Sequence, residues 1–387
     1  MHRHVALPFL FLVSAVGCGS STPAGTPAED TGAEVATDAP TDTAVDPALA
    51  YENAVRAAAW TKLAKGPSVS GGAKQDDVFF TSLTRGFTAS GPGSSIFRTE
   101  DGGATWKNVF THTGTYFRSV LFVDDKHGFA GNLGAGLTPS IDDKNALYET
   151  KDGGDTWAAV TTITGADMPG ICNLTALDDK HLFAVGRANG PANLLSSSDG
   201  GATWTSIDLS AKFSMLIDAR FTSPTEGILA GQNADTPAVC TIMHTADGGK
   251  TFDTVFASKV PNSLCWKLSF PTKDVGYVSV EDSGSGPPTF GKTTDGGKTW
   301  VELPLPTDGS PKAAYPAIGI GFLTDKIGWI SSEDPKKPNY RTFDGGLTWE
   351  VTPDLTGPVN RFRFLDRNTA YAIGASVWKL TIDTKGI

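Results

Sequence analysis

An aspartate recurs six times in this sequence, each time within the motif Thr/Ser-x-Asp-Gly-Gly-x-Thr-Trp/Phe. The six aspartates lie 47 to 51 residues apart and are Asp101, Asp152, Asp199, Asp247, Asp295 and Asp344. A carboxylate can act as a general acid or base, or bind a metal ion. In this motif, however, the paired glycines favour a turn with positive φ, and the carboxylate and the Thr hydroxyl favour hydrogen bonds within that turn. We therefore interpret the six aspartates as turn-forming residues rather than catalysts or metal ligands.

The other side chains that could do chemistry are scattered. His112, His127, His181 and His244 lack the spacing of metal ligands. The acidic pairs Asp142-Asp143, Glu281-Asp282 and Glu333-Asp334 could bind Ca²⁺, although solvated loop acids are the default interpretation. There is no phosphate-binding glycine loop and no local Ser/His/Asp signature. The sequence therefore predicts no cofactor and no metal site.

Cys18 is the candidate for a covalent modification. A short basic start and an apolar core from Val5 to about Val16 form an export signal, because the core is too short for a permanent membrane helix. The following Ala15-Val16-Gly17-Cys18 resembles a bacterial lipobox, in which cleavage precedes a cysteine that carries a diacylglycerol. Residues 1–17 are therefore predicted to be a lipoprotein signal peptide and Cys18 the lipid attachment site. The alternative is an ordinary secretory signal in which Cys18 has no role.

Residues 18–50 have the composition of a tether. They are rich in Thr, Pro and Ala, contain six acidic residues, and have no Lys, Arg or aromatic residue, so we expect them to stay disordered. The formal charge of the chain is −10, and no run of Lys or Arg stands out, which disfavours nucleic-acid binding. Gly19 and Ser20 carry no inner-membrane retention signal, so the chain is predicted to be exported and lipid-anchored at the cell envelope, in the outer membrane, facing the periplasm or the surface.

A second repeat indicates the elements that position the aspartates. An apolar strand, a polar turn and another apolar strand alternate with the Asp motif seven times, at residues 78–89, 120–131, 174–186, 219–231, 268–280, 320–331 and 362–374. Each repeat of about 48 residues then contains four strands, named A to D, which is the size of a propeller blade. The sequence therefore predicts an all-β fold in which residues 51–387 form a seven-bladed β-propeller with four-stranded blades.

The ring is expected to close with strands from both ends of this region. After the seventh hairpin, Ser376 to Thr381 can form strand C, but no strand D follows. Trp60-Thr61-Lys62-Leu63 is similar to the D strand Trp300-Val301-Glu302-Leu303. We therefore expect residues 58–65 to complete the last blade, which leaves no free sheet edge between the first and last blades.

The Asp motif resembles the Asp box, or BNR repeat, of sialidases, sortilin-type receptors and related propellers. With the hairpins included, residues 58–384 resemble the photosystem II assembly and stability factor family of seven-bladed Asp-box propellers. This resemblance implies a non-enzymatic protein that binds protein partners during assembly, through arginines on one face in the photosynthetic members. Because homologues also occur in bacteria without photosystems, it does not imply a role in photosynthesis.

Carbohydrate-active propellers are the competing class. Sialidases have an early Arg-Ile-Pro motif, and Arg56 and Arg85 stand in other contexts. Xyloglucanase-type hydrolases place two aspartates between two tandem propellers, whereas one propeller is predicted here. Glycoside hydrolysis needs two carboxyl groups about 5–9.5 Å apart, which a sequence alone does not reveal. We therefore expect no enzyme, with a sialidase-like hydrolase or a lectin as the alternative.

A partner is expected to bind opposite the Asp boxes, where the D–A and B–C loops converge on the axis. Aromatic and arginine side chains near the starts of the A strands are the candidates for protein contacts, and these are Tyr116, Arg118, Trp266, Tyr315, Arg361 and Arg363. Arg220 is assigned instead to pairing between blades. Cys240 and Cys265 start strands on the same face of adjacent blades and are the expected disulfide, with buried free thiols as the alternative. The predicted protein is a monomeric, membrane-tethered binding platform for protein partners, with a glycan as the other possible ligand.

Overall fold

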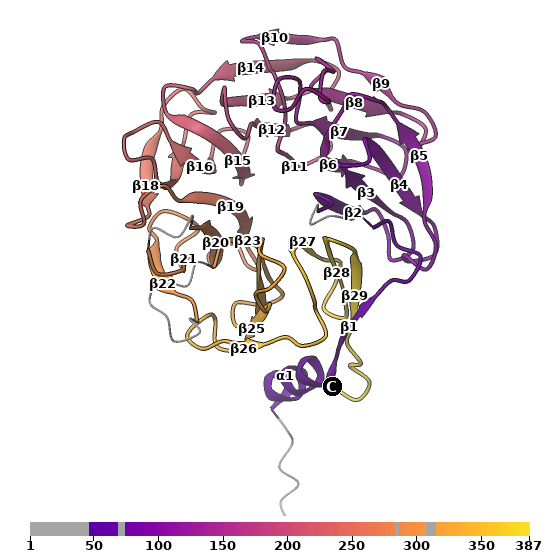
Figure 1. The fold of residues 1–387 in the computed structure, drawn as a ribbon, viewed down its shortest axis with the longest axis vertical. Helices are drawn as coiled ribbons and strands as arrows, with labels where there is room; N and C mark the ends of the chain where they lie inside the picture. Colours follow the sequence, from indigo (N-terminus) through magenta and orange to yellow (C-terminus); the bar gives the residue numbers. More distant parts are fainter. Residues whose placement is uncertain (1–45, 69–73, 283–285, 307–314) are drawn as a thin grey trace, which may run out of the picture. The chain divides into compact units, whose positions relative to one another are not determined.

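Seven antiparallel sheets follow one another around a central axis (Figure 1). The computed structural model describes residues 46–68, 74–282, 286–306 and 315–387. The expected signal peptide, Cys18 and most of the expected tether lie outside these residues. Among the described residues, no helix combines the length and the apolar character needed to cross a bilayer.

Each sheet is one propeller blade, with strand A at the axis and strand D at the rim (Figure 1). In the first four blades the strands are β2 (Asp77–Phe80), β3 (Gly86–Ser90), β4 (Ser95–Thr99) and β5 (Lys107–Thr111) in blade I; β6 (Phe117–Phe122), β7 (Gly128–Asn132), β8 (Leu147–Thr150) and β9 (Ala158–Ala159) in blade II; β11 (Asn173–Ala176), β12 (Leu182–Gly186), β13 (Asn193–Ser197) and β14 (Trp204–Asp208) in blade III; and β15 (Phe213–Phe221), β16 (Gly227–Asn233), β17 (Cys240–Thr245) and β18 (Asp253–Ala257) in blade IV.

The remaining three blades complete the ring. Their strands are β19 (Leu264–Ser269), β20 (Gly276–Glu281), β21 (Thr289–Thr293) and β22 (Val301–Pro304) in blade V; β23 (Ala317–Phe322), β24 (Gly328–Ser332), β25 (Tyr340–Thr342) and β26 (Glu350–Val351) in blade VI; and β27 (Val359–Phe364), β28 (Thr369–Gly374), β29 (Val377–Thr381) and β1 (Trp60–Lys62) in blade VII. The predicted all-β, seven-bladed propeller with four-stranded blades is confirmed.

Blade VII combines both ends of the propeller sequence, as expected. Strand β1 pairs antiparallel with β29, with Trp60 opposite Leu380 and Lys62 opposite Trp378. The Trp60 ring is buried and makes edge contacts with Trp329 and Phe362, at centroid distances of 5.6 and 5.8 Å. The closing strand is therefore held by core packing as well as by its hydrogen-bond ladder.

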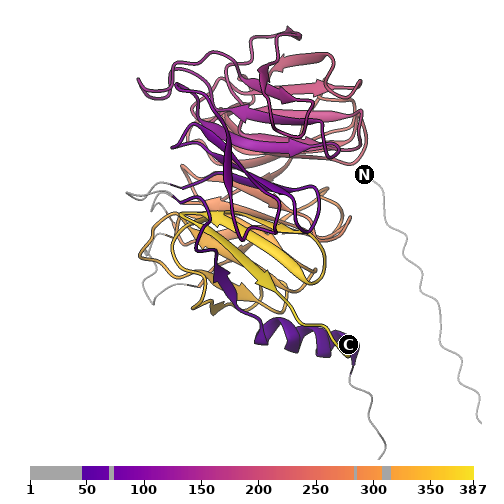
Figure 2. The ribbon, with the colours of Figure 1, turned by 90° about the vertical axis from the view of Figure 1, so that its right-hand side faces the viewer.

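Two elements were not predicted. Helix α1 (Pro47–Ala57) begins after its N-cap Asp46, whose carboxylate accepts a hydrogen bond from the Ala48 N–H at 2.9 Å. Tyr51 and Val55 of this helix are buried in the cluster that contains Trp329 and Trp378, so the helix packs beside the closing strand (Figure 2). The expected boundary between residues 50 and 51 thus falls inside a helix. Strand β10 (Ile163–Gly165) pairs parallel with β14 and adds a fifth strand at the rim of blade III.

The Asp boxes form the C–D turns, and the box of blade II shows their chemistry. The Asp152 carboxylate accepts hydrogen bonds from the Thr156 hydroxyl (2.6 Å), the Thr156 N–H (2.9 Å) and the Thr150 hydroxyl (2.9 Å). Gly153 and Gly154 have φ values of 76° and 85°, which L side chains adopt only with strain. The Gly153 N–H also donates to the Lys126 carbonyl in the A–B turn, so both kinds of turn share one face of the propeller.

Stacked aromatic rings join neighbouring blades. A ring at the start of strand B stacks on the Phe near the end of strand A of the next blade, with centroids 3.4 to 4.0 Å apart at four interfaces. These pairs are Phe87 with Phe122, Phe183 with Phe221, Tyr277 with Phe322, and Tyr371 with Phe80. The blade IV–V interface departs from this pattern, because Ile228 occupies the strand-B position opposite Phe270.

Candidate functional site

Irregularities in the inner strands direct side chains toward the propeller axis. Five A strands, β6, β15, β19, β23 and β27, contain a register shift, and a shifted residue has no partner on strand B. The residues at these shifts include Arg118, Ile217, Trp266, Lys267, Ile318 and Asn360, all of them buried. Ile217, Trp266 and Ile318, from three different blades, share one apolar cluster with Leu133 and Cys172. The axis is therefore packed with side chains.

Charged groups also meet across the axis. Arg361 of blade VII forms an ion pair with Asp77 of blade I at 2.9 Å and donates a hydrogen bond to Asn173 of blade III at 2.9 Å. It also lies 3.9 Å from a carboxylate oxygen of Asp218 in blade IV. Because blades III and IV lie across the ring from blade VII, these contacts can form only through the centre. Arg363 adds a second ion pair with Asp77 at 3.1 Å.

A second charged group lies around Trp266. Arg118 of blade II lies 3.4 Å from Asp76, and its guanidinium carbon lies 4.9 Å from the centroid of the Trp266 ring in blade V. The Trp266 indole N–H donates to Glu281. Asp76 is fully buried, and this burial raises the pKa of its carboxyl group, although Arg118 and Lys74 oppose the effect.

The six residues predicted to bind a partner do not form one open surface. Tyr116, Arg118 and Trp266 lie near Asp76 and Glu281, whereas Arg361 and Arg363 surround Asp77. Tyr315 packs inside blade VI and donates to the Pro338 carbonyl at 3.0 Å. Four of the six have exposed fractions of only 3 to 8%, and these are Arg118, Trp266, Tyr315 and Arg361. Their internal partners give them a structural role at the axis and between strands.

The buried carboxylates hold neighbouring blades together. Asp77 accepts the Val120 N–H of blade II at 3.2 Å, and Asp218 accepts the Leu268 N–H of blade V at 3.0 Å. Each carboxylate thus fixes the inner strand of the next blade, and neither faces a substrate cleft. The exposed Asp-box carboxylates are unsuited to acid catalysis, since the Thr156 hydroxyl and N–H lower the pKa of Asp152 to about 2.

No metal centre forms within the described part of the chain, where no three His, Cys, Asp or Glu side chains gather around a common point. The acidic pairs in the B–C loops have protein partners. Asp143 accepts hydrogen bonds from Asn145 and Tyr148, and Glu333 pairs with Lys74 at 2.8 Å. Cys240 and Cys265 form a disulfide that joins blades IV and V, and Cys172 is a buried free thiol.

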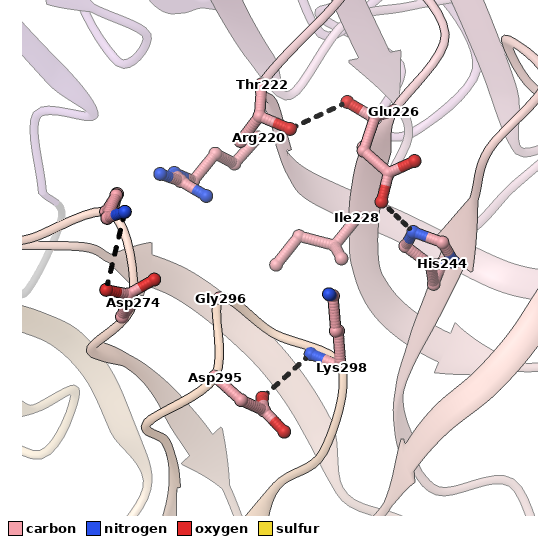
Figure 3. Close-up of a pocket in the computed structure, with 11 residues that line it drawn as sticks. Arg220, Thr222, Glu226, Ile228, His244, Asp274, Asp295, Gly296 and Lys298 are labelled. Carbon is pink, nitrogen blue, oxygen red and sulfur yellow. Dashed lines mark hydrogen bonds and ion pairs between the residues drawn. The ribbon is translucent and has the colours of Figure 1, made fainter.

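An open pocket lies between blades IV and V, on the face that carries the Asp boxes (Figure 3). This IV–V pocket has a volume of about 210 Å³. It is lined by Arg220, Thr222, Glu226, Gly227, Ile228, His244, Lys273, Asp274, Asp295, Gly296 and Lys298. The side chains of Arg220 and Lys298 lie on opposite sides of Ile228, and the Lys298 amine points toward it (Figure 3). Two cationic groups therefore face the pocket from different blades.

Two features distinguish this interface from those in which rings stack and a cation reaches the next Asp box. Ile228 replaces the ring that stacks on the next blade elsewhere, and the Arg220 guanidinium covers Phe270 instead, 4.1 Å from the ring centroid. At three other interfaces a strand-C cation donates to the next Asp box: Arg98 to the Gly153 carbonyl at 2.8 Å, Lys292 to the Gly345 carbonyl at 2.9 Å and Lys379 to the Gly102 carbonyl at 3.4 Å. His244 occupies that position in blade IV and contacts Glu226 at 2.6 Å.

The charges of the pocket differ in how far they are neutralised. Asp295 accepts the hydrogen bonds of its own Asp box, and Glu226 contacts His244. Arg220 makes no ion pair and no hydrogen bond with the described residues, and burial lowers its pKa, which a guanidinium tolerates without losing its charge. A planar guanidinium with unused donors matches a carboxylate in two parallel hydrogen bonds. The arrangement can therefore bind an acidic group.

Arg220 was predicted to pair between blades, and it does contact the next blade, but through an aromatic ring rather than a carboxylate. The pocket itself was not predicted. A usable signal was present, because the residue before the first Thr/Ser of each box reads Arg98, Glu149, Ser196, His244, Lys292 and Arg341. His244 is one of three departures from Lys or Arg at this position, with Glu149 and Ser196, so the signal marks this interface only in combination with Ile228 in place of a ring.

Comparison with known proteins supports the fold and suggests a class. No protein-family model matches the sequence. The chain is 26% identical over 193 residues to a curated protein, the photosystem II assembly lipoprotein Ycf48 of a Synechococcus species (strain CC9902). The match covers 46% of this chain and spans about half (52%) of that relative.

Solved structures show the same architecture at lower identity. A structure described as YCF48 bound to D1 peptide is 15% identical, with a TM-score of 0.59, and the match covers 84% of this chain and 95% of that one. A glycoside hydrolase family 74 xyloglucanase from Xanthomonas campestris is 14% identical with a TM-score of 0.58, over 83% of this chain and 53% of the enzyme. At these identities the structural likeness shows the propeller fold alone.

Proposed function

We propose that this chain is a non-catalytic platform that binds protein partners outside the cytoplasm. The similarity to Ycf48, whose name describes an assembly lipoprotein, supports a protein-binding role, as does the related structure that holds a peptide. The observation that carries the proposal is the Arg220 guanidinium, which stands in the IV–V pocket without a carboxylate partner among the described residues.

The proposed partner is a protein segment that presents an acidic side chain or a terminal carboxylate. Arg220 would take the carboxylate in two hydrogen bonds, and Lys298 would add charge from the neighbouring blade. The apolar surface of Ile228 at the pocket floor would accept a short side chain next to that group. The photosynthetic context of the relative is not part of this proposal, because nothing in the pocket is specific to a photosystem.

Photo-crosslinking from the pocket tests this assignment. A photoreactive amino acid at Thr222 should give discrete protein adducts in intact cells, and Arg220→Gln with Lys298→Gln should reduce them about tenfold. The matched control is Lys107→Gln with Lys180→Gln, which removes the same charge from exposed positions and should leave the adducts unchanged. If both double variants lost the crosslinked adducts to the same extent, the pocket would not be a specific binding site. Glycan turnover abolished by a single carboxylate substitution would instead favour the carbohydrate-active alternative.

We further propose that a lipid on Cys18 holds the propeller at the outer membrane. The lipobox-like Ala15 to Cys18 and the acidic segment up to residue 50 support this localisation. A Cys18→Ala protein should be exported but should leave the membrane fraction in flotation gradients, because a single acyl-bearing residue supplies the anchor. A Cys18→Ala protein that still floats with membranes would refute the anchor while leaving the propeller's binding role open.

A further inference from the structure

A second cavity lies at the axis, where the inner strands of blades V, VI and VII end on the Asp-box face. This axial cavity has a volume of about 330 Å³ and is separate from the IV–V pocket. Its polar lining comes from Lys267, Ser269, Arg361 and Arg363, and Phe322 and Phe364 are among its apolar walls. Three of its four polar residues are therefore cations, supplied by β19 and β27.

Lys267 is the unusual member of this lining. Its exposed fraction is 2%, yet its Nζ has no hydrogen-bond acceptor among the described residues. Burying an ammonium group without a partner is costly, so such a group either loses its proton or acquires an anion. Burial and the nearby Arg361 lower the pKa of Lys267 to about 7, while Asp218 opposes this effect. Because the pKa of Lys267 is about 7, a bound anion would determine whether the amine carries a proton.

The surrounding carboxylates are already in use. Asp77 pairs with Arg361 and Arg363, and Asp218 accepts the N–H groups of Ala219 and Leu268. Lys267, Arg361 and Arg363 carry three positive charges when protonated, against the two negative charges of Asp77 and Asp218. The cluster therefore has one uncompensated positive charge, and a single anion would neutralise it.

Unused donors of Arg363 and Ser269 line this cavity, whereas Lys267 Nζ lies within its wall and has almost no accessible surface of its own. Lys267 has three N–H donors, and Arg363 donates through Nε to the Val78 carbonyl and through Nη2 to Asp77, which leaves Nη1 without an acceptor among the described residues. Ser269 Oγ accepts the Phe322 N–H at 2.9 Å, so its own O–H remains available to donate. An ammonium, a guanidinium nitrogen and a hydroxyl are the donors that bind phosphate and carboxylate oxygens.

We propose that the axial cavity is a binding site for a small oxyanion, a free phosphate-like or carboxylate species, held by Arg363 Nη1 and the Ser269 hydroxyl and by the charge of the Lys267 ammonium group within the cavity wall. The anion completes the charge network that joins blades I, III, IV, V and VII at the axis. Binding there stabilises the closed ring, because the anion has no comparable site in the unfolded chain.

Calorimetric titration of the full chain with phosphate, sulfate and acetate tests the proposal. We expect a saturable site that persists in Arg220→Gln with Lys298→Gln, which removes two cations of the IV–V pocket. The order of affinity at that site distinguishes a phosphate-like from a carboxylate ligand. Lys267→Met, which keeps the length of the side chain and removes the amine, should weaken binding about tenfold or more. It should also abolish the rise in melting temperature that the anion causes. Lys180→Met, at an exposed position that lines neither cavity, is the matched control and should bind like the wild type.

A pH series provides a readout that does not depend on a variant. The charged groups that face Lys267 are Asp77 on β2, Arg118 on β6, Asp218 on β15 and Arg361 on β27. Sulfate keeps its charge between about pH 6 and 9 while Lys267 loses its proton, so sulfate affinity should fall as pH rises through about 7. Absence of saturable binding by all three anions at pH 6, unchanged binding in Lys267→Met, or pH-independent affinity would each overturn the proposal.

Discussion

Individual charged residues at the axis connect blades that do not otherwise touch. Arg361 contacts groups from blades I, III and IV, so its removal leaves Asp77 and Asn173 with fewer partners in a buried setting. Breaking a buried ion pair from one side costs more than the pair contributes in total, because the remaining charge stays desolvated. The free energy of unfolding therefore depends on Arg361 keeping its contacts with Asp77, Asn173 and Asp218.

Arg361→Met should lower the free energy of unfolding by about 3–5 kcal/mol. Urea denaturation followed by tryptophan fluorescence measures this change. Lys107→Met on the exposed strand β5 is the control and should change stability by less than about 0.5 kcal/mol. The double variant Arg361→Met with Asp77→Asn should lose less than the sum of the single changes, and strict additivity would show that the pair is not coupled.

The Asp-box carboxylates give the fold a defined response to acid. The Thr156 hydroxyl and N–H hold the pKa of Asp152 at about 2, below the ordinary aspartate value of 3.8. A carboxylate with a depressed pKa in the folded state stabilises the protein above its ordinary pKa and loses this effect as pH falls through the depressed value. Asp101, Asp199, Asp247 and Asp295 share the same value of about 2.

Asp152→Ala should therefore unfold at a lower urea concentration than the wild type at pH 7, and the difference should shrink between about pH 4 and 2 as the wild-type carboxylate takes up a proton. Denaturation midpoints at a series of pH values measure it. Asp179→Ala removes an exposed carboxylate in an A–B turn and serves as the control. A difference that stays constant down to pH 2 would contradict the role assigned to the ionised box.

At the level of elements, repeated patterns were predictable and single insertions were not. The seven hairpins and six boxes specify the strands through turn chemistry and alternation, and Trp60 marks β1 by its likeness to Trp300. Helix α1 was missed because only Tyr51 and Val55 are buried in this short, alanine-rich segment, which gives too few large apolar positions to show a helical period. The bulges in the A strands were missed because a one-residue shift leaves the apolar pattern almost unchanged.

The closing strand contributes mainly through Trp60. Trp60→Ala should cost about 3–5 kcal/mol, because it removes the ring that packs against Trp329 and Phe362. Leu49→Ala in helix α1 is the control. Because Leu49 is half exposed, this change should lower the free energy of unfolding by less than about 0.5 kcal/mol. Equal and small effects of the two substitutions, measured by urea denaturation, would show that β1 is dispensable for the ring.

For the whole molecule, ligand sites arise where the repeat is broken. Most interfaces stack two rings, and the IV–V interface replaces one ring with Ile228 and leaves Arg220 free. The sequence alone predicted partner contacts near the starts of the A strands, but it could not show that Arg118, Trp266 and Arg361 find partners at the axis. Contacts between distant blades depend on the closed ring, which no local pattern describes.

A substitution that restores the stacked rings at the IV–V interface should abolish partner binding without lowering the free energy of unfolding. Ile228→Phe would place a ring on Phe270, fill the IV–V pocket and displace Arg220, so crosslinking from Thr222 should be lost while the free energy of unfolding stays equal or rises by about 0.5–1.5 kcal/mol. The structurally matched Ile330→Val, in the core of blade VI, should retain crosslinking. Retention of the adducts in Ile228→Phe would show that the partner does not use this pocket.

The pairing of β1 with β29 also determines when the protein can become native during its synthesis. A chain that emerges N-terminus first presents β1 long before β29 exists, so the most distant pairing in the ring forms last and carries the largest loop-closure cost. Until then the six earlier blades remain an open arc with unpaired strand edges. The propeller is therefore complete only after β29 has been synthesised. A product that ends before β29 displays an unpaired strand edge that proteases and chaperones can recognise.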